Sequence, residues 1–129
     1  MSASPSGSHQ ATTIVPHDEV VLAVVGIKLM DDRSCKDLSD AVLPLIEQRR
    51  QPVVLDLSQV QYLPSIAIGA LATILKEVKR LDQRLVLIHV HPTVRQVFAI
   101  TKMDRIFELA ETLEAALTRI HAAAEAPHP

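Results

Sequence analysis

Three short apolar runs dominate the pattern of hydrophobic and polar positions along this chain, at Val20–Val25, Val53–Leu57 and Leu85–Val90. Each is nearly free of polar side chains, which is typical of a strand that is buried on both faces of a parallel sheet. Two weaker segments, Thr12–Val15 and Ile106–Leu109, predict a first and a last strand. The pattern therefore predicts a sheet of four or five strands.

Apolar residues at helical spacing fill most of the sequence between these strands. The predicted helices cover residues 31–49, 65–81, 92–100 and 112–123. Asp31 and Asp32 offer an N-cap to the first helix, and Pro44 should kink or split it. Strands that alternate with helices predict an α/β fold in which helices flank a mixed four- to five-stranded sheet.

The 129 residues are enough for one domain and too few for two. Residues 1–10 are rich in Ser, Gly and Pro, and residues 122–129 in Ala and Pro, so we expect disordered tails around a domain at 11–121. The N-terminus lacks the basic start and apolar core of a signal peptide. No apolar run approaches the roughly 18 residues of a membrane span. These features predict a cytoplasmic protein without membrane insertion.

Composition argues against binding to nucleic acid. Aromatic residues make up only 2% of the chain and the net charge is −2, so neither base stacking nor general electrostatic capture is indicated. Seven basic and three acidic residues lie between Lys76 and Arg105. Such a bias usually marks a solvated helix face, and less often a docking surface for an acidic partner.

Motifs for catalysis and for metal binding are weak. The sequence has no dinucleotide-binding, P-loop or GxSxG motif, and Cys35 is its single cysteine. His89 and His91 would share one face of the predicted strand, but no third metal ligand is adjacent. Asp56 could be a phosphoacceptor at a strand end, although a role in the following turn fits its surroundings better. We therefore expect no cofactor, no metal and no enzyme activity; an enzyme with dispersed catalytic residues is the least favoured alternative.

Ser65 is the most informative polar residue. It follows Pro64 where a buried strand leads through a short connection into a helix, and that helix carries small residues such as Ala67, Gly69 and Ala72. The first N–H groups of a helix lack partners and its N-terminus is positive, so phosphate is favourable there. From its position alone, Ser65 is expected to be the N-cap of this helix.

Several sequence blocks together carry a family resemblance. They are VVLDLSQVQYLPSIAIGAL from Val53, the segment Pro92–Phe98 with its continuation Thr101–Phe107, and Met30–Ser34 before the first helix. This set, over about residues 11–121, resembles the STAS domain of anti-sigma factor antagonists. Asp31–Asp32 and Ile66 also point to stressosome-type STAS proteins as near relatives.

The resemblance implies a binding switch. The serine that a cognate anti-sigma kinase phosphorylates in this family falls on Ser65, and Asp31 falls on the acidic residue near the same loop. The chain departs from the family at Pro64, which replaces an aspartate, and at Ile66, which replaces Ser or Thr. The expected contact residues for the partner are Asp31, Pro64, Ser65, Ile66 and Gly69.

The implied partner is an anti-sigma factor with serine kinase activity and a histidine-kinase-like ATPase fold. The unphosphorylated chain would bind this kinase and release a sigma factor, and phosphate on Ser65 would end the complex. Other STAS proteins are further possible partners. A second reading is a STAS scaffold subunit in a stressosome-like or transporter-associated complex.

Overall fold

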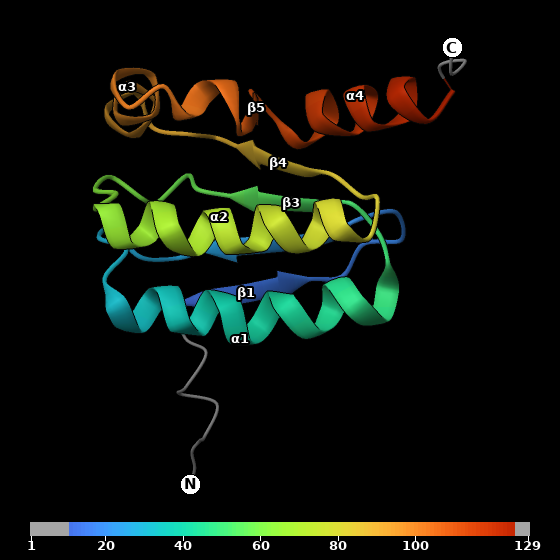
Figure 1. The fold of residues 1–129 in the computed structure, drawn as a ribbon, viewed down its shortest axis with the longest axis horizontal. Coiled ribbons are helices and arrows are strands. Elements are labelled where there is room, and N and C mark those ends of the chain that lie inside the picture. Colours follow the sequence, from blue (N-terminus) through green and yellow to red (C-terminus); the bar gives the residue numbers. More distant parts are fainter. Residues whose placement is uncertain (1–10, 126–129) are drawn as a thin grey trace, which may run out of the picture.

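The computed structural model describes residues 11–125, which form one five-stranded mixed sheet covered by helices (Figure 1). The strands lie in the order of the sequence: β1 Thr12–Val15, β2 Val21–Val25, β3 Val53–Asp56, β4 Leu85–Ile88 and β5 Glu108–Ala110. β1 is antiparallel to β2, and the pairs β2–β3, β3–β4 and β4–β5 are parallel. The mixed α/β sheet expected from the sequence is confirmed.

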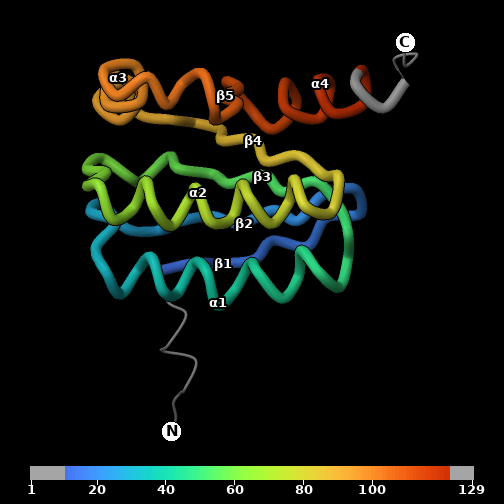
Figure 2. Tube along the Cα trace, viewed as in Figure 1, coloured from blue at the N-terminus to red at the C-terminus, as the bar shows by residue number. Residues whose placement is uncertain are grey.

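The helices occupy both faces of this sheet. They are α1 Asp32–Arg49, α2 Ser65–Arg80, α3 Pro92–Ile100 and α4 Leu113–Glu125, with a short 3₁₀ helix, η2, at Met103–Arg105. Figures 1 and 2 show α1 and α2 side by side over one face. Side chains of α4 pack against the other face, where Ala116 and Ile120 join Val54 and Val86 in a smaller core.

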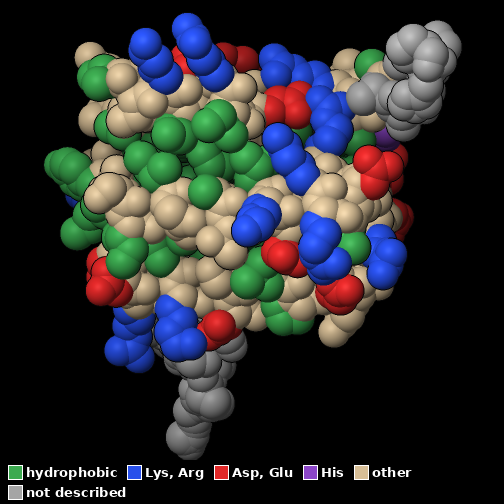
Figure 3. All heavy atoms as spheres, in the orientation of Figure 1, with side chains coloured by type: hydrophobic (Ala, Val, Ile, Leu, Met, Phe, Trp, Pro, Cys, Tyr) green, Lys and Arg blue, Asp and Glu red, His purple; other side chains and the backbone are tan. Residues whose placement is uncertain are grey.

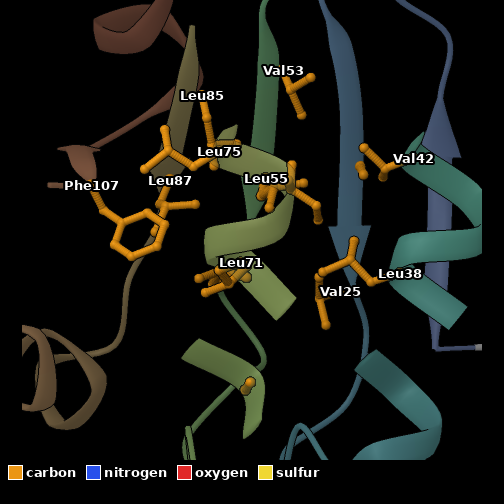
Figure 4. Close-up of a cluster of buried hydrophobic side chains, with 14 of the residues drawn as sticks. Val25, Leu38, Val42, Val53, Leu55, Leu71, Leu75, Leu85, Leu87 and Phe107 are labelled. Carbon is orange, nitrogen blue, oxygen red and sulfur yellow. The ribbon is translucent and has the colours of Figure 1, made fainter. Parts of the chain in front are cut away.

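The larger core lies between the sheet and the pair α1–α2. Leu38 and Val42 of α1 and Leu71 of α2 point toward the sheet residues Val25 and Leu55 (Figure 4). Successive residues of a strand point to opposite faces. Because both faces are buried here, the positions of the central strands are apolar except for Asp56, the last residue of β3, which explains the continuous runs in the sequence.

Two of the predicted strands end earlier than their apolar runs. β3 ends at Asp56, whose Oδ1 accepts a hydrogen bond of 2.8 Å from Ser58 N, so Asp56 starts a turn as expected. β4 ends at Ile88. Leu57 and Val90 are still buried, because the loops after these strands also face the core.

Pro44 was expected to kink or split this helix; α1 runs unbroken from Asp32 to Arg49, so the split is wrong. Pro44 is exposed, whereas Val42 and Ile46 on either side are buried in the core. The backbone carbonyl that loses its helical partner at a proline is therefore free to bond to water. Burial of the neighbouring apolar side chains keeps the helix continuous.

His89 and His91 do not share a strand face, which corrects the arrangement predicted for them. His89 follows the end of β4 in the left-handed region, with φ of 53°. His91 is the N-cap of α3, and its Nδ1 accepts a hydrogen bond of 3.3 Å from Thr93 N. Residues 11–125 contain no group of three His, Cys, Asp or Glu side chains that could hold a metal ion.

α4 extends farther than expected. Thr112 begins it, with Oγ1 accepting from Ala115 N at 3.1 Å, and the helix continues to Glu125. Residues 122–125 therefore belong to the helix and not to the C-terminal tail assigned from composition, while the rest of both expected tails, 1–10 and 126–129, lies outside the described residues. None of the helices within 11–125 is long and apolar enough to cross a membrane.

Candidate functional site

The loops that lead into α1 and α2 are hydrogen-bonded to each other. Lys28 O accepts from Gln61 N at 2.8 Å and from Tyr62 N at 3.0 Å, and Met30 N donates to Tyr62 O at 3.2 Å. A parallel bridge joins Leu29 to Tyr62. β2 and β3 are parallel neighbours, so both loops leave the same edge of the sheet. The N-termini of α1 and α2 consequently lie together (Figure 1).

Ser65 is the first residue of α2 and not its N-cap, so the predicted capping role is wrong. Pro64 occupies the cap position with φ −72° and ψ 169°, and it has no side chain that could cap. Its carbonyl accepts from Ala67 N at 2.9 Å and from Ile68 N at 3.3 Å. Among residues 11–125 no hydrogen bond engages the exposed Ser65 hydroxyl, which is therefore accessible from outside the protein.

The electrostatic surroundings of Ser65 favour an added phosphate. The first turn of α2 contains no acidic residue. The helix presents the positive end of its dipole and its first N–H groups at this position. A phosphate on Ser65 would thus meet attraction from the helix and no carboxylate in its first turn.

Three large apolar or aromatic side chains are exposed in the segments next to Ser65 and in the loop bonded to them. Ile66 is 47% exposed, Tyr62 is 57% exposed and Leu29 is 47% exposed, so each leaves apolar surface in contact with water. We name Leu29, Tyr62, Pro64, Ser65, Ile66 and Gly69 the switch surface. Large exposed apolar side chains that gather on one surface are typical of a protein contact.

Gly69 leaves the backbone of α2 uncovered one turn after Ser65. No glycine among the described residues has a positive φ, so the conformation of Gly69 is one that any residue can adopt. A Cβ at this position would meet nothing within 4 Å. Neither backbone geometry nor packing among the described residues requires glycine here, so the backbone of α2 is open to the surroundings at this position.

Asp31 caps α1. Its Oδ1 accepts from Ser34 N at 3.0 Å and from Ser34 Oγ at 2.9 Å. The hydrogen bond from Ser34 N, followed by that from the Ser34 side chain, lowers the pKa of the Asp31 carboxyl. The expected N-cap is confirmed. Asp31 is exposed, and it lines an open hollow of about 310 Å³ with Arg33 and Asp37.

We predict that Asp31→Asn removes the contribution of the Asp31 carboxyl to the pH dependence of the free energy of unfolding. The folded pKa of Asp31 lies below the ordinary value of 3.8, so its stabilising effect is complete above that value and is lost as pH falls through the folded pKa. Asn keeps the cap acceptor and does not titrate, whereas Asp31→Ala should lower the melting temperature by a few degrees at neutral pH. Thermal unfolding between about pH 6 and about pH 2 measures the difference between wild type and Asp31→Asn. A constant difference across this range would contradict the prediction.

The structure brings together most of the residues that the sequence singled out and adds two. Pro64, Ser65, Ile66 and Gly69 lie in or beside the first turn of α2, and the loop before Asp31 is bonded to the loop before Ser65. Leu29 and Tyr62 were missed. A signal for them existed, since both are large apolar residues outside every predicted strand and helix.

The chain belongs to the STAS domain family, whose model matches residues 12–116. It is 27% identical to BtrV of Bordetella bronchiseptica, described as an anti-sigma factor antagonist, over 88 residues that cover 68% of this chain and 76% of BtrV. A crystal structure of an anti-sigma factor antagonist from Mycobacterium paratuberculosis is 25% identical, with a TM-score of 0.74, and covers 85% of this chain and 92% of its own.

More distant structures share the fold. SpoIIAA of Bacillus in its phosphorylated form is 20% identical with a TM-score of 0.66, covering 85% of this chain and 99% of its own. A chain from the stressosome structure is 20% identical with a TM-score of 0.71, covering 88% of this chain and 100% of its own. The resemblance to the anti-sigma factor antagonist family is thus confirmed. That family consists of non-enzymatic regulators, which speaks against the alternative of dispersed catalytic residues.

Proposed function

We propose that this chain binds an anti-sigma factor with serine kinase activity through the switch surface and Asp31, and that phosphate on Ser65 ends the complex. The observation that supports the proposal is an exposed serine hydroxyl at the N-terminus of α2, without a hydrogen-bond partner in residues 11–125 and with the exposed Ile66 next to it in the chain. The kinase would have the histidine-kinase-like ATPase fold, and the switch would operate in the cytoplasm. An anti-sigma factor held in this way cannot hold its sigma factor.

The chemistry of the surface explains how one phosphate could end the complex. Phosphorylation adds about −1.5 to −2 charges at pH 7. Ile66 and Tyr62 beside Ser65 offer no cation, so burial of this charge against a partner would cost several kcal/mol unless the partner supplied one. A shift from nearly all bound to nearly all free requires the two forms to differ in binding free energy by about 5.5 kcal/mol. Phosphate at this position can supply much of that difference.

Pro64 supports a preformed site. Its ring restricts φ, and its carbonyl accepts the first hydrogen bonds of α2, so the chain enters the helix in one conformation. It supplies no carboxylate beside Ser65. The added phosphate therefore has no negatively charged neighbour at position 64.

Phosphorylation by the native anti-sigma kinase tests the proposal. We expect mass spectrometry to find one phosphate, located on Ser65, after incubation with the kinase and ATP. Ser65→Ala should abolish it, whereas Ser58→Ala, which removes an exposed hydroxyl from the preceding loop, should not. An active kinase that binds the chain and leaves Ser65 unmodified would refute the switch.

A scaffold role in a larger STAS assembly is a second candidate. Ile100 is 73% exposed and Ile106 is 51% exposed, and both lie outside the switch surface. These side chains provide a further apolar area for neighbouring subunits, including other STAS proteins. Light scattering of the pure chain would support this role by a mass well above 14.2 kDa, and a monomer that remains alone in the presence of its partners would exclude it.

A further inference from the structure

Helix α3 begins at an imidazole nitrogen. His91 is its N-cap, with φ −60° and ψ 143°, and His91 Nδ1 accepts a hydrogen bond of 3.3 Å from Thr93 N. Ser, Thr, Asp, Asn and Gly are the residues preferred at this position, and none of them changes charge near neutral pH as histidine does. The first turn of α3 therefore depends on an acceptor that a proton can remove.

The hydrogen bond to Thr93 also determines which ring nitrogen of His91 carries the proton. A neutral imidazole has one N–H donor and one acceptor nitrogen. Since Nδ1 accepts from Thr93 N, the proton of the neutral ring lies on Nε2. A second proton, added at Nδ1, converts the acceptor into a donor, and the bond to Thr93 N is lost.

The remaining groups of the first turn do not replace this bond. Pro92 at N1 has no N–H to satisfy, and Arg95 N already donates to His91 O at 2.8 Å. The first turn of α3 contains no acidic residue. Because the N-terminus of a helix is the positive end of its dipole, an imidazolium there is unfavourable as well as unable to cap.

The charged groups near His91 give its ring no carboxylate partner among residues 11–125. On its own segment lie the exposed His89 and, one turn into α3, Arg95. From the β5–α4 connection, Glu111 pairs with Arg95 at 3.6 Å, and from the end of β3, Asp56 accepts from the backbone of the following turn. On the face drawn in Figure 3, apolar side chains and no acidic ones are seen between α3 and the adjacent part of α2.

His121 on α4 shows the opposite arrangement. Its Nε2 lies 2.6 Å from Glu19 Oε2, so a proton on that ring strengthens the contact. The ring of His91 has a backbone N–H as its partner, so a proton breaks the contact. Acid therefore acts on these two histidines in opposite directions.

We propose that His91 is an acid-sensitive cap, which holds the first turn of α3 at neutral pH and releases it when the ring gains a proton. The cap stabilises the helix above the pH range in which histidine becomes charged, and its contribution is lost as pH falls through that range. β3 and β4 are parallel, so α3 leaves the same end of the sheet as α2. The loosened turn is thus at the end of the sheet that carries Ser65.

His91→Asn tests the cap, because Asn supplies an acceptor oxygen that does not titrate. The melting temperature of His91→Asn relative to wild type should rise by about 3 °C or more between about pH 7.5 and about pH 5.5. The other histidines are present in both proteins, so their contributions cancel. A difference that stays constant over this range would overturn the proposal.

His89→Asn is the matched control. It changes an exposed histidine that lies outside the helix and whose ring makes no hydrogen bond among the described residues. His89 has φ of 53°, a conformation that Asn tolerates well, so the variant should fold. Its difference in melting temperature from wild type should stay constant with pH. A rise equal to that of His91→Asn would show that the effect does not come from the cap.

NMR of the ring and of the Thr93 amide gives a direct measurement. At about pH 7.5 the ring nitrogen spectra of wild type should show His91 with its proton on Nε2. On acidification the Thr93 amide signal should shift with the same midpoint as the His91 ring, and this shift should be absent from His91→Asn. A neutral ring protonated on Nδ1, or a Thr93 amide that does not follow the ring, would overturn the proposal. These experiments use the chain alone, so their outcome is independent of the switch at Ser65.

Discussion

Ser65→Asp is expected to weaken the complex with the anti-sigma kinase at least tenfold, about 1.4 kcal/mol, while Ser65→Ala leaves its affinity within about twofold. The carboxylate places a permanent charge among exposed apolar side chains that a partner must cover, and Ala adds no charge. Calorimetry with the native partner measures both affinities. Ser65→Ala should also make the complex insensitive to ATP.

Neither variant should lower the stability of the fold appreciably, although Ser65→Asp should weaken binding. Ser65 does not cap α2, so Ser65→Ala should change the free energy of unfolding by less than about 0.5 kcal/mol. Ser65→Asp adds a negative charge to the first turn, which stabilises a helix by about 0.3–1 kcal/mol. A loss of affinity together with unchanged or higher stability cannot result from unfolding. Equal affinity of wild type and both variants would rule out the switch at Ser65.

Gly69→Gln is expected to raise the stability of the fold and to weaken partner binding at least tenfold. Glycine in a helix costs about 0.5–1 kcal/mol relative to a good helix former, and a Cβ at this position has open space. The same side chain would stand between the backbone of α2 and a partner that approaches one turn after Ser65. Chemical denaturation and calorimetry measure the two effects.

Two further variants make the Gly69 result specific. Gly69→Ala should give a similar gain in stability with a smaller loss of affinity, because a methyl group displaces the partner less than the longer glutamine side chain does. Thr118→Gln, at an exposed position of α4, should leave the affinity unchanged. If Gly69→Gln binds the partner as tightly as wild type, the contact surface does not include this part of α2.

The elements that could be predicted from the sequence are those governed by local periodicity. The apolar runs at β2, β3 and β4 predicted their strands because a strand that is covered on both faces has no polar position. The cap at Asp31 was also predictable, since it depends on a serine only three residues away. Ser65 could be placed at the start of a helix for the same reason: the change from strand to helix pattern lies within a few residues.

Other features depend on contacts between distant segments. Pro44 leaves α1 unbroken because Val42 and Ile46 are held by the sheet, and no local rule contains that contact. The pairing of Leu29 with Tyr62, which brings the loop before Asp31 to the loop before Ser65, joins residues more than thirty positions apart. His89 and His91 were misplaced because β4 ends where its neighbour strands end, and not where the apolar run ends.

The amino-acid sequence by itself determined the fold class, the order of the elements and the position of the serine, because hydrophobic burial requires these patterns wherever the chain packs. Only the tertiary structure decided the surroundings of that serine. Pro64 takes the cap position, so the Ser65 hydroxyl has no hydrogen-bond partner within residues 11–125, and the meeting of two loops brings the exposed Leu29 and Tyr62 to the end of the sheet where α2 begins. Which side chains are exposed, and which of them lie close to Ser65, depends on how segments distant in the sequence pack. Here the parallel strands bring those segments together.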